Sequence, residues 1–210
     1  MPMISPHKVL LSVAGIWTLA VMTPGPNFLL TVQTAVARSR SAALWSVLGT
    51  SCGTVIWGLS GFFGITLLFR TAPWLYGALK LLGGGYLIYL GLRLLVRKAT
   101  DPTPVIDRRA VPPTAQANWR AGLLTNLSNP KTAAFVTSLF AACLPSQAPV
   151  WLGLASVGLM VSLSLMWYTT VACLFALPPC TAFYQRSRHW IDRSAGAIFI
   201  AFGARLAVDR

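Results

Sequence analysis

The sequence predicts an all-α integral membrane protein with six transmembrane helices, arranged as two inverted three-helix repeats. Three observations predict this fold. First, 55% of the 210 residues are hydrophobic and only 10% are charged, whereas about a quarter of the residues in a soluble domain are charged. Second, several apolar segments reach the roughly 20 residues that a helix needs to cross a bilayer. Third, the two halves of the chain contain similar motifs in the same order.

Six apolar segments are expected to span the membrane. They cover residues 9–33, 43–69, 74–96, 119–144, 149–177 and 190–208. The longest connection, RKATDPTPVIDRRAVPPTAQAN, contains four prolines and has no apolar periodicity, which is typical of a flexible linker. We therefore divide the chain into a first repeat (1–98), a polar cytoplasmic linker (99–117) and a second repeat (118–210).

The net charge of +13 is expected to reflect cytoplasmic loops rather than nucleic-acid binding. Eleven basic residues fall in the alternate loops on one side of the predicted spans, and four fall on the opposite side. Because Lys and Arg accumulate on the cytoplasmic side of membrane proteins, the eleven-residue side should be cytoplasmic. Both termini are then predicted to lie on the opposite, outer side of the membrane.

The third and sixth segments carry the clearest internal repeat. KLLGGGYLIYLGLRLL begins at Lys80 and DRSAGAIFIAFGARLA begins at Asp192. Gly84, Gly91 and Arg93 each have an identical residue exactly 112 positions later, at 196, 203 and 205. Since each half has three spans, an odd number, the halves must have opposite topologies. This is the inverted repeat found in many secondary transporters.

Proline motifs interrupt the first span of each half. The first is Pro24-Gly25-Pro26-Asn27 and the second is Asn129-Pro130-Lys131. Paired interruptions at corresponding positions of two halves point to a transport site. Proline removes a helix hydrogen bond to the carbonyl four residues back. Pro24 should thus release the carbonyl of Ala20, Pro26 that of Met22, and Pro130 that of Asn126.

The chemistry of these breaks suits a zwitterion such as an amino acid. Released carbonyls accept hydrogen bonds from an ammonium group, and a restarting helix offers amide hydrogens and a positive dipole end to an anion. The side chains of Asn27, Asn126 and Asn129 add amide groups. The alternative is that the prolines only make packing kinks, but the pairing of the breaks favours a site.

Lys131 is the most informative residue of the second break. A lysine near the bilayer centre costs roughly 2.5–3.5 kcal/mol on insertion scales. That cost falls if the side chain faces a wet cavity and meets a carboxylate. We therefore expect Lys131 to bind the substrate carboxylate, directly or through water. The alternative is that the span is shifted and Lys131 reaches an interface with its charged end.

Asp192 is the only acidic residue at the edge of a predicted span, which makes it a candidate proton carrier. The alternative, which we favour, is a first-turn aspartate that interacts with the helix dipole or with Arg193. The glycines of the second and third spans are expected to mediate close helix packing or a dimer face. No metal or cofactor site is expected.

Four stretches resemble the LysE/Rht family of amino-acid exporters: TPGPNFLLTVQTA, ALKLLGGGYLIYLGLRLL, RAGLLTNLSNPKTAAFVTSLFAACLP and GAIFIAFGARLAV. The resemblance covers nearly the whole chain. It implies an inner-membrane efflux protein for amino acids such as threonine, homoserine or lysine, driven by the proton-motive force. Pro24 to Asn27 match the first-span motif and Asn129 to Lys131 the fourth-span motif. The family commonly has a glycine soon after the first span, whereas here the first is Gly49, which leaves the subfamily open.

The favoured function is therefore proton-coupled export of an amino acid by alternating access, without an enzymatic step. A basic substrate should require an acidic recognition group, so a neutral, threonine-like or homoserine-like substrate is preferred. One alternative is a membrane thiol electron carrier, but the four cysteines (Cys52, Cys143, Cys173 and Cys180) form no CxxC pair and are expected to pack as small apolar residues. Export of another small metabolite or of a metal ion, and a non-transporting scaffold, are further alternatives.

Overall fold

The computed structural model describes residues 5–71, 73–96, 114–145 and 148–177, together with parts of 187–204. All regular structure in these residues is helical. The helices are α1 (Pro6–Met22), α2 (Pro26–Ala37), α3 (Arg40–Thr71), α4 (Pro73–Val96), α5 (Ala115–Leu127), α6 (Pro130–Cys143) and α7 (Val150–Phe175). Further helical residues lie at 187, 189–190, 193–194, 196–201 and 203–204, and we call them the C-terminal segment.

Length and composition identify candidate membrane spans among the described helices. Arg40–Gly64 and Val150–Phe175 are each long and apolar enough to cross a membrane, and α1 and α2 qualify together as one bent span. Large apolar side chains such as Leu11 and Met166 are exposed, while Asn126 and Ser164 are buried. Apolar residues outside and polar residues inside suit a lipid environment. The remaining spans of the six-span arrangement stay a prediction.

Both predicted helix breaks are present. The axes of α1 and α2 differ by 53°, and the intervening Gly25 is extended. In the second half, α5 ends at Leu127 and α6 begins at Pro130. Each restarting helix has proline in its first turn, where the missing amide hydrogen costs nothing and the fixed φ suits a helix.

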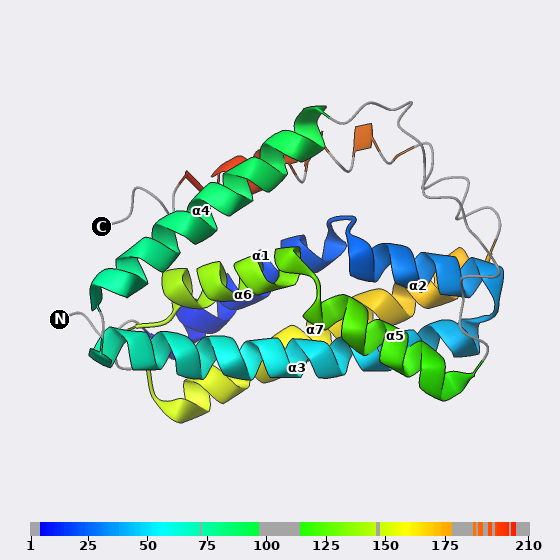
Figure 1. Cartoon of the computed structure of the whole chain (residues 1–210), viewed down its shortest axis with the longest axis horizontal. Helices are drawn as coiled ribbons and strands as arrows, with labels where there is room; N and C mark the ends of the chain where they lie inside the picture. The colour runs from blue at the N-terminus through cyan, green and yellow to red at the C-terminus, as the bar shows by residue number, and fades with distance from the viewer. Residues whose placement is uncertain are drawn as a thin grey trace.

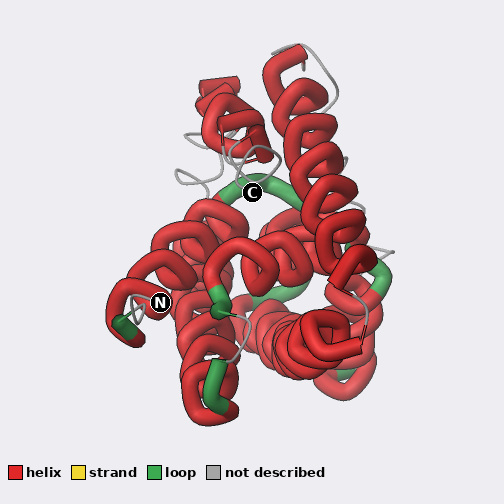
Figure 2. The backbone as a smooth tube through the Cα atoms, turned by 90° about the vertical axis from the view of Figure 1, so that its left-hand side faces the viewer, coloured by secondary structure: helices red, strands yellow, loops and turns green. Residues whose placement is uncertain are grey.

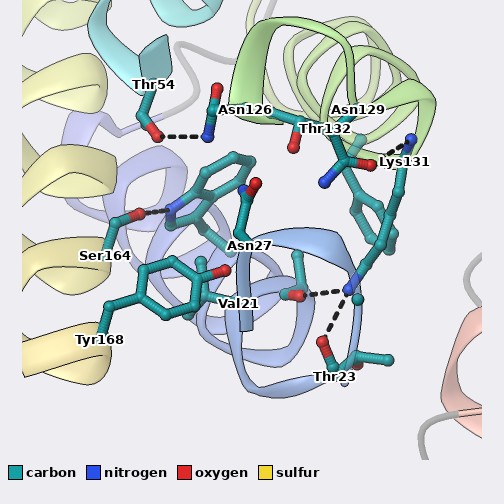
Figure 3. A pocket seen from close by; sticks show the side chains of 14 residues that line it. Val21, Thr23, Asn27, Thr54, Asn126, Asn129, Lys131, Thr132, Ser164 and Tyr168 are labelled. Carbon is teal, nitrogen blue, oxygen red and sulfur yellow. Dashed lines mark hydrogen bonds between the residues drawn. The ribbon is translucent and has the colours of Figure 1, made fainter. Parts of the chain in front are cut away.

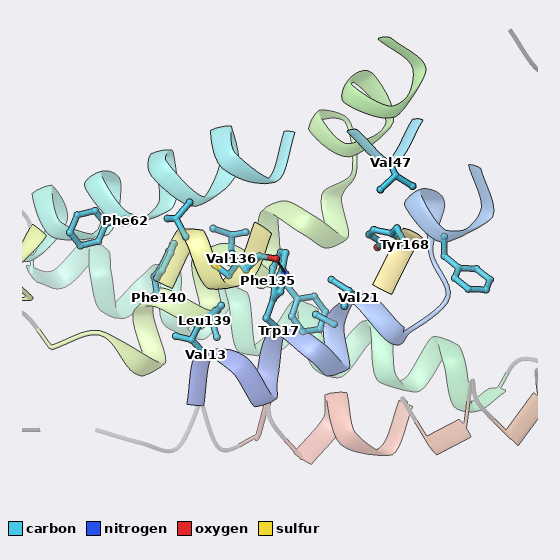
Figure 4. Close-up of a cluster of buried hydrophobic side chains, with 14 of the residues drawn as sticks. Val13, Trp17, Val21, Val47, Phe62, Phe135, Val136, Leu139, Phe140 and Tyr168 are labelled. Atoms are coloured by element: carbon cyan, nitrogen blue, oxygen red, sulfur yellow. Dashed lines mark hydrogen bonds between the residues drawn. The ribbon is translucent and has the colours of Figure 1, made fainter. Parts of the chain in front are cut away.

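Helix α6 lies at the centre of the helix bundle, between α1, α3 and α4. Its Val136, Leu139 and Phe140 are completely buried, and Phe62 of α3 packs edge-on against Phe140 (Figure 4). In a membrane, such side chains stabilise the fold through close van der Waals packing rather than through removal from water. The N-terminus of α6, which carries Lys131, is thereby held inside the protein.

Helices α3 and α5 cross with their backbones in direct contact. A Cβ atom added at Gly49 would collide with the backbone carbonyl of Trp119, and one added at Gly122 would collide with that of Ser46. Small residues at such crossings allow close approach. The expectation of close helix packing is confirmed for Gly49, Gly53 and Gly61, but a Cβ atom at Gly64 or Gly85 would meet nothing within 4 Å. A dimer face stays a prediction.

Helix α4 and the C-terminal segment lie together on one side of the other helices (Figure 1; Figure 2). A Cβ atom added at Gly91 would lie 2.6 Å from the carbonyl oxygen of Gly196, and one added at Gly203 would lie 2.5 Å from that of Gly84. Gly91 and Gly203 are equivalent positions 112 residues apart, and so are Gly84 and Gly196. Replacing each residue by its equivalent in the other half therefore turns one contact into the other. This is the contact pattern that a pseudo-two-fold axis between the two helices produces.

Three sequence predictions fall wholly or partly outside the described residues. The 99–117 linker is described only from Thr114, whose hydroxyl oxygen accepts a hydrogen bond from the Ala117 amide at 3.2 Å. This cap starts α5 at Ala115, four residues before the span start predicted at 119. The capping role of Thr114 was not predicted from the sequence. Asp192 and both chain termini are outside the described residues, so the proton-carrier role and the orientation stay predictions.

Candidate functional site

The two helix breaks meet at a small polar cavity inside the bundle (Figure 3). The space open to the centre of a water molecule is about 20 Å³, which suffices for about one water. The cavity in the described structure is therefore too small to hold an amino acid. Its walls come from α1, α2, α3, α5, α6 and α7, and are formed by Trp17, Ala20, Val21, Thr23, Gly25, Asn27, Thr54, Asn126, Asn129, Lys131, Thr132, Phe135, Ser164 and Tyr168.

The Lys131 ammonium links the second break to the first. Its Nζ donates hydrogen bonds to the carbonyl oxygens of Ala20 at 2.9 Å and Thr23 at 2.8 Å. The Ala20 carbonyl is the one that Pro24 was predicted to release. The ammonium also lies 5.9 Å from the ring centroid of Phe135 and 5.7 Å from that of Phe199, within the range of cation–π attraction. Backbone dipoles and ring faces thus stabilise this charge inside the protein.

Gly25 leaves room for the Lys131 side chain. A Cβ atom added at Gly25 would lie 3.4 Å from both Cδ and Nζ of Lys131, which is van der Waals contact. Any side chain larger than alanine at position 25 would therefore compete with the lysine for the same space. This explains why glycine suits the position between the two prolines without any need for an unusual backbone conformation.

Two asparagine residues of the cavity wall have buried side-chain oxygens without a hydrogen-bond partner. Asn126 donates from Nδ2 to the Thr54 hydroxyl at 3.3 Å, but its Oδ1 has no hydrogen-bond partner, and neither has Oδ1 of Asn27. Both side chains are at least 95% buried. A buried polar atom without a partner costs about 1–3 kcal/mol, so these two acceptors favour a ligand with hydrogen-bond donors.

The carbonyl predicted to be released by Pro130 also has a partner. The indole Nε1 of Trp57 donates to the Asn126 carbonyl oxygen at 3.2 Å. On the other side of the break, Oδ1 of Asn129 accepts a hydrogen bond from the Lys131 amide at 3.0 Å, with the Asn129 amide nitrogen on the cavity side (Figure 3). Asn129 is therefore a helix cap as well as a wall of the cavity.

The structure places the predicted site residues in two groups. Gly25, Asn27, Asn126, Asn129 and Lys131 all line the cavity. The prolines act differently: Pro24, Pro26 and Pro130 lie at the chain breaks and shape the backbone.

The contribution of α7 and of mid-span aromatic residues was not predicted from the sequence. Trp17 of α1 donates from Nε1 to the Met160 carbonyl and the Ser164 hydroxyl, both at 2.9 Å. The hydroxyl of Tyr168 lies beside the Asn27 amide (Figure 3). Trp and Tyr are enriched at membrane interfaces, so their positions well inside predicted spans were a signal that these residues face a polar interior.

The residues on which the alternative functions depend were also located. Cys52 is exposed, and Cys143 and Cys173 are partly buried. Cys180 is outside the described residues. In the described part of the chain, no group of three His, Cys, Asp or Glu residues comes together as a metal site.

Comparison with known proteins gives one consistent result. The model of the family described as LysE type translocator matches residues 18–210. The threonine efflux protein of Escherichia coli K12 is 35% identical over 205 residues, covering 95% of this chain and 98% of that protein. The leucine efflux protein of Salmonella choleraesuis is 26% identical over 191 residues, covering 89% of each chain. No solved structure matches this chain.

Proposed function

Since this chain belongs to the LysE type translocator family, whose members are transporters, we propose that it exports a neutral amino acid across the bacterial inner membrane by proton-coupled alternating access. One observation carries the proposal. The two broken helices converge on one buried cavity that holds an ammonium, released backbone carbonyls and two asparagine oxygens without partners. Helix breaks that only bent the chain would not require these groups to meet.

The groups at the cavity complement an amino acid. The oxygens of Asn27 and Asn126 accept hydrogen bonds from an ammonium or hydroxyl group, and the Lys131 ammonium attracts a carboxylate. A basic side chain would need an anionic partner, and the fourteen lining residues include no Asp or Glu. The names of the threonine and leucine efflux proteins agree with a neutral substrate.

Alternating access is supported by the small volume of the cavity and by the symmetric contacts between α4 and the C-terminal segment. A volume of about 20 Å³ is far too small for an amino acid, so the halves have to move apart on one side at a time. The exchangeable contacts of Gly91 with Gly196 and of Gly203 with Gly84 are those expected of an inverted repeat, in which such rocking is common.

Asp192, the acidic residue that the sequence places at the edge of the last span, is the candidate to test for proton coupling, although the sequence favours a structural role for it. Replacement by asparagine removes the titrating group while keeping its size. Efflux by Asp192→Asn should then no longer respond to an imposed pH gradient. An unchanged response would assign Asp192 to the helix dipole or to Arg193 instead.

Efflux from cells preloaded with amino-acid dipeptides tests the proposed function. Wild type should accelerate the loss of one or more neutral amino acids, and Lys131→Ala at equal membrane abundance should not. Arg93→Ala is the matched control, because Arg93 is an exposed cation away from the cavity. If wild type moves no amino acid, the proposed function is wrong. If Lys131→Ala exports like wild type, the transporter assignment stands and Lys131 is structural.

A further inference from the structure

A second pocket lies directly beside the polar cavity. It is formed by Leu19, Met22 and Thr23 at the end of α1 and by Ile198 and Phe199 of the C-terminal segment, with Trp190 and Ser194 at its edge. Measured as space open to water centres, it has about 300 Å³, against about 20 Å³ for the polar cavity. Its walls are mainly apolar, and no role was predicted for it.

The Lys131 ammonium stands between the two spaces. Thr23 lines both of them, and its carbonyl oxygen accepts a hydrogen bond from Nζ. Phe199, which lines the larger pocket, has its ring centroid 5.7 Å from the same nitrogen. A molecule in the larger pocket therefore meets Lys131 and the end of α1 before it reaches Asn27 or Asn126.

We infer that the Lys131 ammonium occupies the position that the substrate ammonium takes during transport, and that the apolar pocket receives the substrate side chain. This inference rests on the proposed amino-acid export. The substrate ammonium replaces Lys131 at the carbonyls of Ala20 and Thr23. The displaced lysine then pairs with the substrate carboxylate, and the side chain stays between α1 and the C-terminal segment.

The exchange is favourable because the carbonyls of Ala20 and Thr23 and the ammonium of Lys131 all keep a partner. If Lys131 left alone, two carbonyl oxygens in a water-poor interior would lose their donor, which is unfavourable. An arriving ammonium restores both hydrogen bonds, and an arriving carboxylate gives the lysine a new partner. A molecule with only one of the two charged groups leaves either the carbonyls or the lysine without a partner. The site thus discriminates in favour of zwitterions.

The size of the pocket explains where the side chain lies. A space of about 20 Å³ admits about one water, whereas about 300 Å³ lies at the lower end of the usual range for small-molecule pockets. Leu19, Met22 and Ile198 are partly exposed and offer aliphatic contacts. An aliphatic or hydroxylated side chain suits these walls, while a charged one would not.

Binding to purified protein in lipid nanodiscs tests the ammonium site, with L-threonine, L-leucine and the carboxylate-free amine L-threoninol as probes. Wild type should bind at least one of the amino acids and should bind threoninol weakly. Lys131→Ala empties the carbonyl site, so threoninol should bind it roughly 10-fold or more tighter than wild type. Lys131→Met also removes the charge but keeps a long side chain in the same place, so it should show no such gain.

The outcomes distinguish failure of this inference from failure of the proposed function. If wild type binds an amino acid but Lys131→Ala gains no affinity for threoninol, the carbonyls of Ala20 and Thr23 are not the ammonium site and this inference is overturned. An equal gain in Lys131→Met overturns it as well, because that side chain still fills the site. If wild type neither binds nor exports any amino acid, the proposed function itself is wrong.

The side-chain pocket is tested by filling it. Ile198→Trp places a bulky aromatic ring in the pocket, and Leu11→Trp makes a bulky change at an exposed α1 position that does not line it. Ile198→Trp should weaken binding of leucine at least 10-fold more than binding of alanine, and Leu11→Trp should change neither. An equal loss for both amino acids in Ile198→Trp would exclude this pocket as the side-chain site.

Discussion

Replacing Gly53 by alanine should displace Asn126 in the cavity wall, while the same change at Gly64 on the same helix should leave the cavity unchanged. A Cβ atom at Gly53 would lie 2.7 Å from Oδ1 of Asn126 and 2.8 Å from its Cβ, whereas nothing lies within 4 Å of a Cβ at Gly64. Asn126 is buried and the break at Pro130 follows it. The asparagine therefore has to move, and the cavity wall moves with it.

The size of the effect follows from comparing the two variants. Both gain up to about 1 kcal/mol from the higher helix propensity of alanine, and this gain cancels in the difference. Gly53→Ala additionally pays for overpacking, typically about 1–3 kcal/mol. For a chain of this size, 1 kcal/mol corresponds to roughly 2–4 °C in Tm. Gly53→Ala should thus unfold roughly 2–12 °C below Gly64→Ala.

Thermal unfolding of the two purified variants in the same detergent measures this difference, and efflux at equal membrane abundance measures the effect on the site. Gly64→Ala should be at least as stable as wild type and should transport normally. Gly53→Ala should be less stable and should lose most transport. If the two variants unfold at the same temperature and transport equally, the close packing of Gly53 on Asn126 does not hold this site together.

Three further predictions concern other contacts. Trp17→Phe removes the donor shared by the Met160 carbonyl and the Ser164 hydroxyl, and should lower the free energy of unfolding by about 1–3 kcal/mol in a detergent unfolding titration. Asn126→Leu removes an unpaired buried acceptor, and should reduce efflux at least 10-fold without lowering Tm by more than a few degrees. Gly91→Ala and Gly203→Ala meet equivalent atoms, so their Tm decreases should agree; clearly unequal decreases would argue against the pseudo-two-fold relation.

The helix breaks were predictable because proline acts locally. Pro24 and Pro130 end the preceding helix whatever surrounds them, and Pro26 and Pro130 suit the first turn of the next one. The start of α5 was predicted four residues late, because the capping role of Thr114 depends on a short-range hydrogen bond in a segment without apolar periodicity. Local chemistry thus located the broken spans, and errors were confined to their ends.

The partners of the released carbonyls were not predictable. From the sequence, a substrate ammonium was expected at the Ala20 carbonyl and a substrate carboxylate at the Lys131 ammonium. In the structure, the Lys131 ammonium instead donates a hydrogen bond to the Ala20 carbonyl. They are separated by 111 positions in the chain. Only the packing of α6 against α1 brings them together. Because both spans are rich in Leu, Val and Phe on all sides, their sequences do not show which faces pack against each other.

For the same reason, Trp17, Ser164 and Tyr168 were not predicted to line the cavity. In a soluble helix, polar positions mark the outward face, but these spans are apolar nearly all round, so periodicity does not identify the inner face. Their polar groups are the better indicator, since lipid offers no hydrogen-bond partner. A tryptophan or tyrosine well inside a span must find its partner within the protein, as Trp17 does on α7.

The paired breaks are useful to a transporter because they create polar groups that can change partners. An intact helix would keep the carbonyl of Ala20 in a backbone hydrogen bond, out of reach of any ligand. The break makes that carbonyl available, and Lys131 from the other half holds it in the described structure. Since the interaction joins the first half to the second, any ligand that replaces it also loosens the contact between the halves. Under the proposed alternating access, recognition of the substrate and opening of the site would then be coupled.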